Sequence, residues 1–206
     1  MKIYLARHGE TEYNRKRLLM GQKDIPLNKK GVKQAEKLAK YMKDKGITAI
    51  YSSDLSRAFK TAEIIGEELN LPVTEFGEFK EHSLGNLDGS EWTEEMELMT
   101  KEEFGKLMSS AGAENVNEFY DRVWNKFNDV VENHQKGENL LLVMHGGCTR
   151  AIIMNILKTS EEIFSSLRQF NACVNIIIYD ENRIRSKFII EKINECNHLE
   201  EHMTHS

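Results

Sequence analysis

The most hydrophobic stretch of the chain, LLLVM at residues 140–144, constrains the fold more than any other feature. Its apolar residues do not alternate with polar ones, as they do in a strand with one face in water. An unalternated run is typical of a parallel strand that helices cover on both faces. The sequence therefore predicts a central strand here, in a domain of the α/β class.

A second apolar run opens the chain, and both runs end in a histidine followed by glycine. Residues 3–6 lead into Arg7 and His8, and residues 140–144 lead into His145. Sites in open α/β sheets lie beyond the carboxyl ends of the strands. We therefore expect both histidines to lie in one pocket.

Strand and helix signals alternate through the rest of the chain. Asn28 is the predicted N-cap of a first helix, and Gly46 is the predicted end of this helix. The side chains of residues 52–54 are expected to cap a second helix. Arg57 falls in the first turn of this second helix and is expected near the pocket. The architecture expected from these signals is a three-layer sandwich, with helices on both faces of a mostly parallel sheet. The predicted strands are residues 3–6, 47–51, 73–76 and 140–144 with an edge hairpin of 173–179 and 184–190, and the predicted helical stripes are 32–42, 58–69, 116–131 and 151–157, with a short helix from Ser160 and an irregular loop at 15–27.

The length of 206 residues, 40% of them hydrophobic, favours one globular domain over two. We expect residues 1–193 to form a single catalytic domain, in which residues 90–113 are a helical lid insert with a capping box at residues 100–103. Residues 194–206 are polar and predict a frayed tail. His198 and His202 lie in this tail at helical metal-ligand spacing, without the order of a zinc-protease motif.

Charge and cysteine content exclude several classes of protein. The 28 Lys and Arg against 33 Asp and Glu give a net charge of −5, which argues against nucleic acid as a partner. No apolar run approaches the roughly 20 residues that span a bilayer, so no membrane contact is expected. The three cysteines show no CxxC spacing, which indicates neither a disulfide framework nor a zinc site and favours a cytoplasmic location.

The residues at the strand ends suit phosphoryl transfer. A neutral imidazole attacks phosphorus when its second nitrogen is held by a hydrogen bond, and His8 is placed to do so. The charge on the transferred group requires cationic donors, which Arg7, Arg57 and a protonated His145 would supply. Backbone N–H groups at the turns after the two histidines add donors without a metal.

Phosphoester hydrolysis also requires a carboxyl group that protonates the leaving alkoxide and later deprotonates water. Glu81 stands out because it follows the predicted strand 73–76 and precedes a glycine-punctuated stretch. The residues alone do not select it from the other acids. Its neighbour His82 is expected to be structural.

Four segments of the chain, in order, resemble the histidine phosphatase superfamily, whose fold is that of the phosphoglycerate mutases. They are RHGET at 7–11 with Asn14, GQKDIPL at 21–27 with Gly31 and residues 34–35, SSDLSRA at 52–58 with residues 61–62, and LVMHGG at 142–147. Residues 21–27 look like the phosphatase branch, which includes α-ribazole phosphatases and broad-specificity enzymes.

The resemblance implies a role for each matched residue of the site. These are His8 as the phosphorylated nucleophile, Arg7, Arg57 and His145 as the phosphate pocket, Glu81 as proton donor and acceptor, and Asn14, Gln22 and Gly146 as substrate-binding residues. It implies a small phosphorylated metabolite as the substrate and no metal or other cofactor. A homodimer is compatible with these expectations, and the sequence does not determine the oligomeric state.

The choice between a phosphatase and a mutase is harder, because both share this core. The interval between Glu81 and His145 is shorter than in cofactor-dependent phosphoglycerate mutases and contains no paired arginines. We therefore favour hydrolysis of a phosphomonoester. A phosphoglycerate mutase, a regulatory protein that binds phosphoesters without turnover, and a metal-dependent hydrolase that uses the histidines as ligands are the alternatives.

Overall fold

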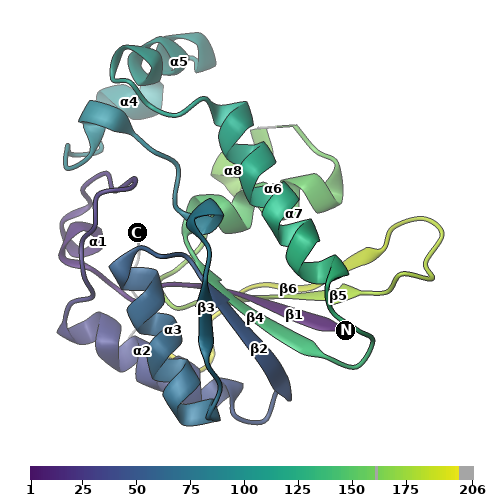
Figure 1. Cartoon of the computed structure of the whole chain (residues 1–206). Helices are drawn as coiled ribbons and strands as arrows, with labels where there is room; N and C mark the ends of the chain where they lie inside the picture. Colours follow the sequence, from purple (N-terminus) through teal and green to yellow (C-terminus); the bar gives the residue numbers. More distant parts are fainter. Residues whose placement is uncertain (161, 200–206) are drawn as a thin grey trace.

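A mostly parallel sheet forms the centre of the protein (Figure 1). The computed structural model describes residues 1–160 and 162–199. Across the sheet of these described residues the order is β3 (Val73–Glu75), β2 (Ile47–Ser52), β4 (Asn139–Met144), β1 (Lys2–Arg7), β5 (Val174–Tyr179) and β6 (Phe188–Glu195). β1 pairs in parallel with β4, and β2 pairs in parallel with both β4 and β3, whereas β5 pairs antiparallel with both β1 and β6. The predicted α/β class is therefore confirmed.

The central strand is β4, as its hydrophobic run predicts. All residues from 140 to 144 are fully buried, between β1 on one side and β2 on the other. The register places Arg7 opposite Met144, and the His8 N–H donates to the Met144 carbonyl at 3.0 Å. His8 and His145 therefore leave the sheet at neighbouring positions of the same edge.

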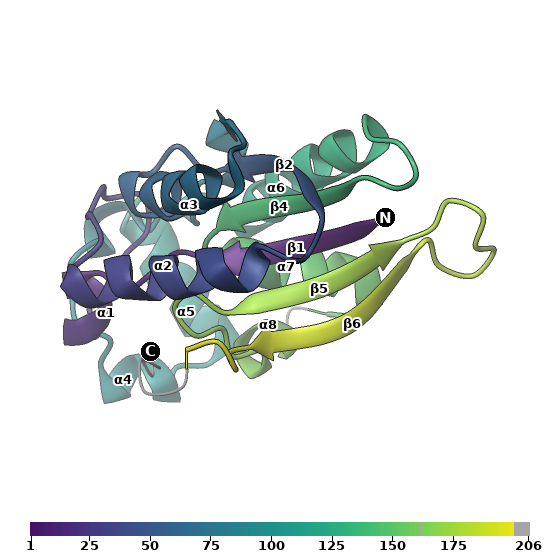
Figure 2. The ribbon, with the colours of Figure 1, turned by 90° about the horizontal axis from the view of Figure 1, so that it is seen from below.

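Helices cover both faces of the sheet, α2 (Lys29–Met42) and α3 (Ser56–Leu69) on one and α6 (Val116–Glu132) and α7 (Gly146–Leu157) on the other. Figure 1 shows the first pair below the sheet and the second pair above it, and Figure 2 shows the first pair from its solvent side. Alternate side chains of β1 enter the two cores between these layers. None of the helices in residues 1–160 and 162–199 has the length and apolar character needed to cross a membrane.

Two helix ends differ from the predicted ones, the C-terminal end of α2 and the cap of α3. Asn28 caps α2 as predicted, but the helix ends at Met42 and Gly46 belongs to the turn that follows. Residues 52–54 do not cap α3; instead the Ser56 N–H donates to the Asp24 carboxylate at 2.8 Å, from a distant loop. A short helix that was not predicted, α1 (Glu12–Lys16), includes the first two residues of the predicted irregular loop 15–27.

The segment around residues 90–113 forms a helical arm, which contains α4 (Glu94–Leu98) and α5 (Lys101–Ser110). The predicted capping box at Thr100 is present. No residue from 92 to 110 is buried, and the arm lies at the top of Figure 1, away from the sheet. Backbone hydrogen bonds of 2.8–3.0 Å fix both ends of the arm: they join Leu19 to Gly89 and Ser90, Asn86 to Ala111, and Ser83 to Glu114.

The C-terminal segment contradicts the predicted frayed tail. β6 begins at Phe188, after a loop longer than the predicted turn, and runs to Glu195 at the sheet edge. Beyond it Leu199 is fully buried, and His198 donates from Nε2 to the Ala172 carbonyl at 3.0 Å and stacks on Tyr41. The contacts of these two side chains thus attach residues 194–199 to the domain, whereas His202 lies outside the described residues. The short helix predicted from Ser160 is α8 (Glu162–Ser166), and Glu161 also lies outside them.

Candidate active site

The carboxyl ends of the parallel strands bring three separately predicted residues together. His8 follows β1, His145 follows β4, and Arg57 lies in the first turn of α3 after β2. The two imidazole rings are 5.3 Å apart between centroids, and all three side chains are buried. The expected convergence of these residues is confirmed.

A single hydrogen bond determines the tautomer of His8. Its Nδ1 lies 2.7 Å from the Gly9 carbonyl oxygen, and because a carbonyl only accepts, Nδ1 carries the hydrogen. The lone pair then lies on Nε2. Burial lowers the pKa of His8 well below 6.5, and the positive charges of Arg57 and Arg7 lower it further, so the ring is neutral at neutral pH. A neutral Nε2 is the form that a nucleophile requires.

His145 is held by the hydroxyl of Ser53. The Oγ of Ser53 accepts from the Leu55 N–H at 3.3 Å, and among the described residues His145 Nε2, at 3.0 Å, is the acceptor within reach of its hydroxyl hydrogen. A buried hydroxyl hydrogen that bonds to Nε2 leaves the proton of His145 on Nδ1, a buried nitrogen with no hydrogen-bond partner among the described residues. This donor is available to an anion.

The protonated His145 expected from the sequence does not fit the site without an anion. Burial lowers the pKa of His145 well below 6.5, and Arg57 and His8 add to this effect. The neutral ring still offers its Nδ1–H to a phosphoryl oxygen. A bound dianion would counter the charge of the arginines and favour the protonated form.

The guanidinium groups of Arg57, which is fully buried, and of Arg7, which is half-buried, supply the positive charge. Arg57 donates to the Gly21 carbonyl at 2.7 Å and to the Lys23 carbonyl at 2.9 Å, and its Nε has no hydrogen-bond partner in the described part of the chain. Arg7 donates through Nη1 to the Gln169 carbonyl. Burial lowers the pKa of Arg7 to about 10 and also lowers that of Arg57, so both remain charged at neutral pH. Buried cations of this kind favour the binding of an anion.

The carboxyl group of Glu81 lies against the first turn of α7. One oxygen, Oε2, accepts from the Gly147 N–H at 3.0 Å, and the other accepts from the His82 N–H at 2.9 Å. A Cβ atom at position 147 would lie only 2.2 Å from Oε1, so a glycine is required for this approach. The hydrogen bond thus brings Glu81 to the turn that directly follows His145.

The three residues expected to bind substrate differ in their contacts. Asn14 accepts through Oδ1 from the Thr11 N–H and from Asn171, each at 3.1 Å, and so supports the turn after His8. Gln22 donates to the Glu81 carbonyl at 3.1 Å. Gly146 is the first residue of α7, close to Arg7.

Several residues that support the site were not among the predicted site residues. Asn171 donates to the His8 carbonyl at 3.2 Å, and Thr61 accepts from the Gly9 N–H at 3.1 Å. Thr61 and Ser53 lie in segments that resemble the superfamily, which could have indicated them. Asn171 and Gln169 lie in a segment without a motif, and only the tertiary structure brings them to the strand end.

The side chain of His82 has structural contacts. His82 donates to the Glu114 carbonyl at 2.8 Å and packs on Phe119, which confirms its structural role. Within residues 1–160 and 162–199, no group of three or more His, Cys, Asp or Glu side chains is arranged to hold a metal ion. The three cysteines are free and buried.

Known proteins resemble this chain over nearly its whole length. The uncharacterized phosphatase PhoE of Bacillus subtilis is 34% identical over 90% of this chain and 92% of its own, and a probable phosphoglycerate mutase, GpmB of Salmonella paratyphi B, is 32% identical over 97% and 95%. Among solved structures, the phosphoserine phosphatase of Entamoeba histolytica has the same fold, with a TM-score of 0.81 at 23% identity over 96% of this chain and 98% of its own. YhfR of Bacillus stearothermophilus has a TM-score of 0.79 at 25% identity over the same shares.

The arrangement of the site agrees with these similarities. A neutral imidazole with a fixed tautomer faces a second imidazole beside two guanidinium groups, and a carboxyl group lies at the margin. Residues 3–192 match the histidine phosphatase superfamily (branch 1). The chain therefore belongs to the histidine phosphatase superfamily.

Proposed function

We propose that this protein hydrolyses phosphate monoesters of small metabolites through a phosphohistidine on His8. The observation that supports this most is the state of His8. Its Nδ1–H is bound to the Gly9 carbonyl, its ring is neutral, and the charges of Arg7 and Arg57 act on it. A neutral nucleophile next to fixed positive charge suits attack on a phosphoryl group.

The reaction would proceed in two steps. In the first, Nε2 of His8 attacks phosphorus, the ester P–O bond breaks, and the protonated carboxyl group of Glu81 gives its proton to the leaving alkoxide. In the second, the Glu81 carboxylate takes a proton from water, whose oxygen attacks phosphorus as the P–N bond breaks. Inorganic phosphate leaves, and both His8 and Glu81 return to their first states. Arg7, Arg57 and the Nδ1–H of His145 would stabilise the charge in both steps.

The phosphohistidine is tested by trapping. The protein is mixed with a ³²P-labelled phosphomonoester and quenched without acid, and the label is expected to be acid-labile and to be absent from His8→Ala. A wild-type protein that turns over substrate without any label on His8 would sink the proposed mechanism. Activity that survives a chelator would support metal-independent hydrolysis, and activity lost in chelator and restored by a divalent metal would favour the metal-dependent alternative.

The second candidate is a phosphoglycerate mutase, because one relative carries that name. The two reactions are distinguished by the acceptor of the phosphoryl group, which is water in one case and a second hydroxyl in the other. A panel of phosphoserine, 3-phosphoglycerate, sugar phosphates, nucleotides and α-ribazole phosphate is therefore assayed for released phosphate. Transfer between the 2- and 3-positions of phosphoglycerate that depends on a bisphosphorylated primer would favour the mutase. Inactivity across the whole panel would favour a regulatory protein.

The helical arm is proposed as the lid of this site, within a single catalytic domain. Its two attached ends and its unburied helices are the features that support this role. Elements that bury few apolar contacts open at low free energy, which a lid requires. An enhanced protection of amide hydrogens in residues 93–110 on binding of orthovanadate would agree with closure, and unchanged protection would argue against it.

A further inference from the structure

The guanidinium group of Arg122, in the first half of α6, contacts the segment that carries Glu81. Its Nη1 donates to the carbonyls of Glu78 at 2.7 Å and Lys80 at 2.8 Å, and its Nη2 donates to the carbonyl of Glu81 at 3.0 Å. Three backbone carbonyls in a span of four residues are thus held by one side chain. Together with the two contacts to Glu114 described below, these bonds need the five donors of a planar guanidinium group, whereas an ammonium group has three donors on one nitrogen.

Glu114 completes this arrangement from the end of the arm. Its carboxylate pairs with Arg122 through both oxygens, with Nε at 2.6 Å and Nη2 at 2.9 Å. The pair is largely buried, with 22% of the Arg122 side chain and 17% of the Glu114 side chain exposed. Glu114 also accepts from the Ser83 N–H and donates its own N–H to the Ser83 carbonyl. It therefore holds the chain on the other side of Glu81.

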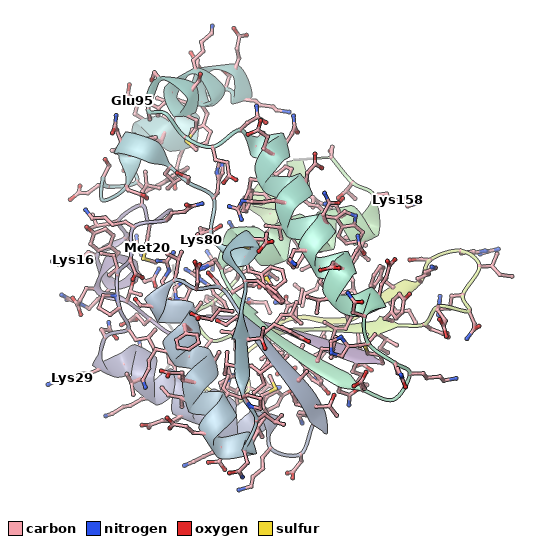
Figure 3. The ribbon with its side chains drawn as sticks, in the orientation of Figure 1. Lys16, Met20, Lys29, Lys80, Glu95 and Lys158 are labelled. Carbon is pink, nitrogen blue, oxygen red and sulfur yellow. The ribbon has the colours of Figure 1, made fainter. Side chains whose placement is uncertain are left out.

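The thiol of Cys148 supports the same segment from α7. Its Sγ lies 3.3 Å from the Phe79 carbonyl and 3.2 Å from the Lys80 carbonyl. Together with Arg122, this side chain brings donors to all four consecutive carbonyls from Glu78 to Glu81. Figure 3 shows Lys80 in this segment, with Glu95 of the arm far above it. A short 3-10 helix, Gly77–Phe79, ends in this segment, and side chains bond the carbonyls at its end and directly after it.

We propose that the ion pair of Arg122 and Glu114 positions Glu81 for proton transfer to the leaving group. Arg122 is a positioning residue, because its contacts reach the backbone of Glu81 and not the reacting atoms. A misplacement of about 1 Å at a reacting group can cost about 100-fold in rate. This inference rests on the proposed role of Glu81 and adds the ion pair that holds Glu81 in place for that role.

The test compares three variants of the pair over a series of phosphate esters with graded leaving groups. Arg122→Gln, Arg122→Lys and Glu114→Gln are assayed for kcat/KM from phenyl phosphate to 2,4-dinitrophenyl phosphate. Because 2,4-dinitrophenolate leaves without a proton, its kcat/KM is expected to change little, whereas that of phenyl phosphate falls by about 10- to 100-fold. Arg122→Lys is expected to behave like Arg122→Gln, since the charge without the fork does not hold the carbonyls.

The matched control is the exposed ion pair of Arg15 and Glu12, whose side chains are 59% and 50% exposed. Arg15→Gln is expected to leave the whole series unchanged. An equal loss for good and poor leaving groups, together with a lowered Tm, would mean that Arg122 only stabilises the fold and would overturn the proposal. Unchanged kcat/KM for phenyl phosphate in all three variants would overturn it as well. Neither result affects the proposed function, which fails separately if wild-type His8 takes no label.

Discussion

The orientation of each imidazole in the site is set by one neighbouring oxygen. The Gly9 carbonyl fixes the hydrogen of His8 on Nδ1, and the Ser53 hydroxyl leaves the hydrogen of His145 on Nδ1 as well. The two rings therefore differ in what they offer to phosphorus: His8 offers the lone pair of Nε2, and His145 offers a donor. A substitution at Ser53 would alter the donor that His145 offers and not the lone pair of His8.

Ser53→Ala is expected to lower kcat/KM about 10-fold, because His145 would lose the bond that holds its ring and tautomer. The measurement is kcat/KM for 2,4-dinitrophenyl phosphate. Ser52→Ala is the matched control, since Ser52 is also fully buried and its hydroxyl donates to the Ser53 carbonyl without contact to His145. Equal effects of the two substitutions would contradict a specific role for Ser53.

Sequence reasoning succeeds at the residue scale where function follows from position on a strand end. His8, Arg57 and His145 were predicted in this way, and the structure brings them together. The supporting residues could not be found by that route. Asn171, for example, reaches the His8 carbonyl only because an antiparallel strand starts beside β1.

Among the elements, the turn after β1 and the first turn of α2 are so close that a Cβ atom at the glycine of either turn would collide with the backbone of the other. A Cβ at Gly9 would lie 2.4 Å from the Gly31 carbonyl oxygen, and a Cβ at Gly31 would lie 2.1 Å from the Glu10 carbonyl oxygen. Both obstacles are backbone atoms, which cannot rotate away. The position of the His8 turn thus depends on a glycine of the neighbouring helix.

Gly31→Ala is expected to lower the free energy of unfolding by about 1–3 kcal/mol and to reduce activity, because the added methyl group displaces the turn. Urea unfolding and kcat/KM measure the two effects. Gly105→Ala in α5 is the control, since nothing lies within 4 Å of its Cβ position, and it is expected to add about 0.5–1 kcal/mol of stability. A neutral Gly31→Ala would refute the close approach.

The segment after β6 is the element that sequence reasoning judged wrongly. Polar composition from residue 194 onward predicts fraying, but Leu199 is fully buried in the core that contains α2. The predicted cap of α3 was also wrong, because the first N–H of the helix donates to Asp24 and not to the adjacent residues 52–54. Periodicity determines where elements lie, whereas their ends depend on contacts that are distant in sequence.

Leu199→Ala is expected to lower the free energy of unfolding by about 2–5 kcal/mol, as for other large-to-small changes in a core. Leu98→Ala is the matched control, because Leu98 is 85% exposed in the arm and its truncation is expected to change stability little. Chemical denaturation of both variants gives the comparison. Equal stability of the two would mean that the C-terminal segment does not dock in solution.

For the whole molecule, buried histidines make stability depend on pH. Burial lowers the pKa values of His8, His145 and His198 below 6.5, while in the unfolded chain they titrate near 6.5. Below that pH the unfolded chain binds more protons than the folded one, so the free energy of unfolding falls as pH falls. The contribution of the buried neutral histidines to the free energy of unfolding is fully present above about pH 7.

Lowering the pH from 7.5 to 5.5 is therefore expected to reduce the free energy of unfolding by up to about 1.4 kcal/mol per pH unit for each buried histidine. Urea unfolding at several pH values measures the slope. His198→Gln is expected to make the slope shallower, and saturating phosphate, which pairs with protonated His145, is expected to do the same. A slope of zero between pH 7 and 5.5 would contradict the burial of neutral imidazoles.

The pairing of β1 with β4 has a consequence for how activity arises during folding. This pairing joins the start of the chain to a strand that is synthesised after two-thirds of it, and β5 then flanks β1 on its other side. Contacts of such sequence separation form slowly and only once the intervening chain is compact. A nascent chain that ends before β4 holds the nucleophile without its partner histidine. Recovery of turnover after dilution from denaturant therefore reports the closing of the sheet, and not the earlier formation of its helices.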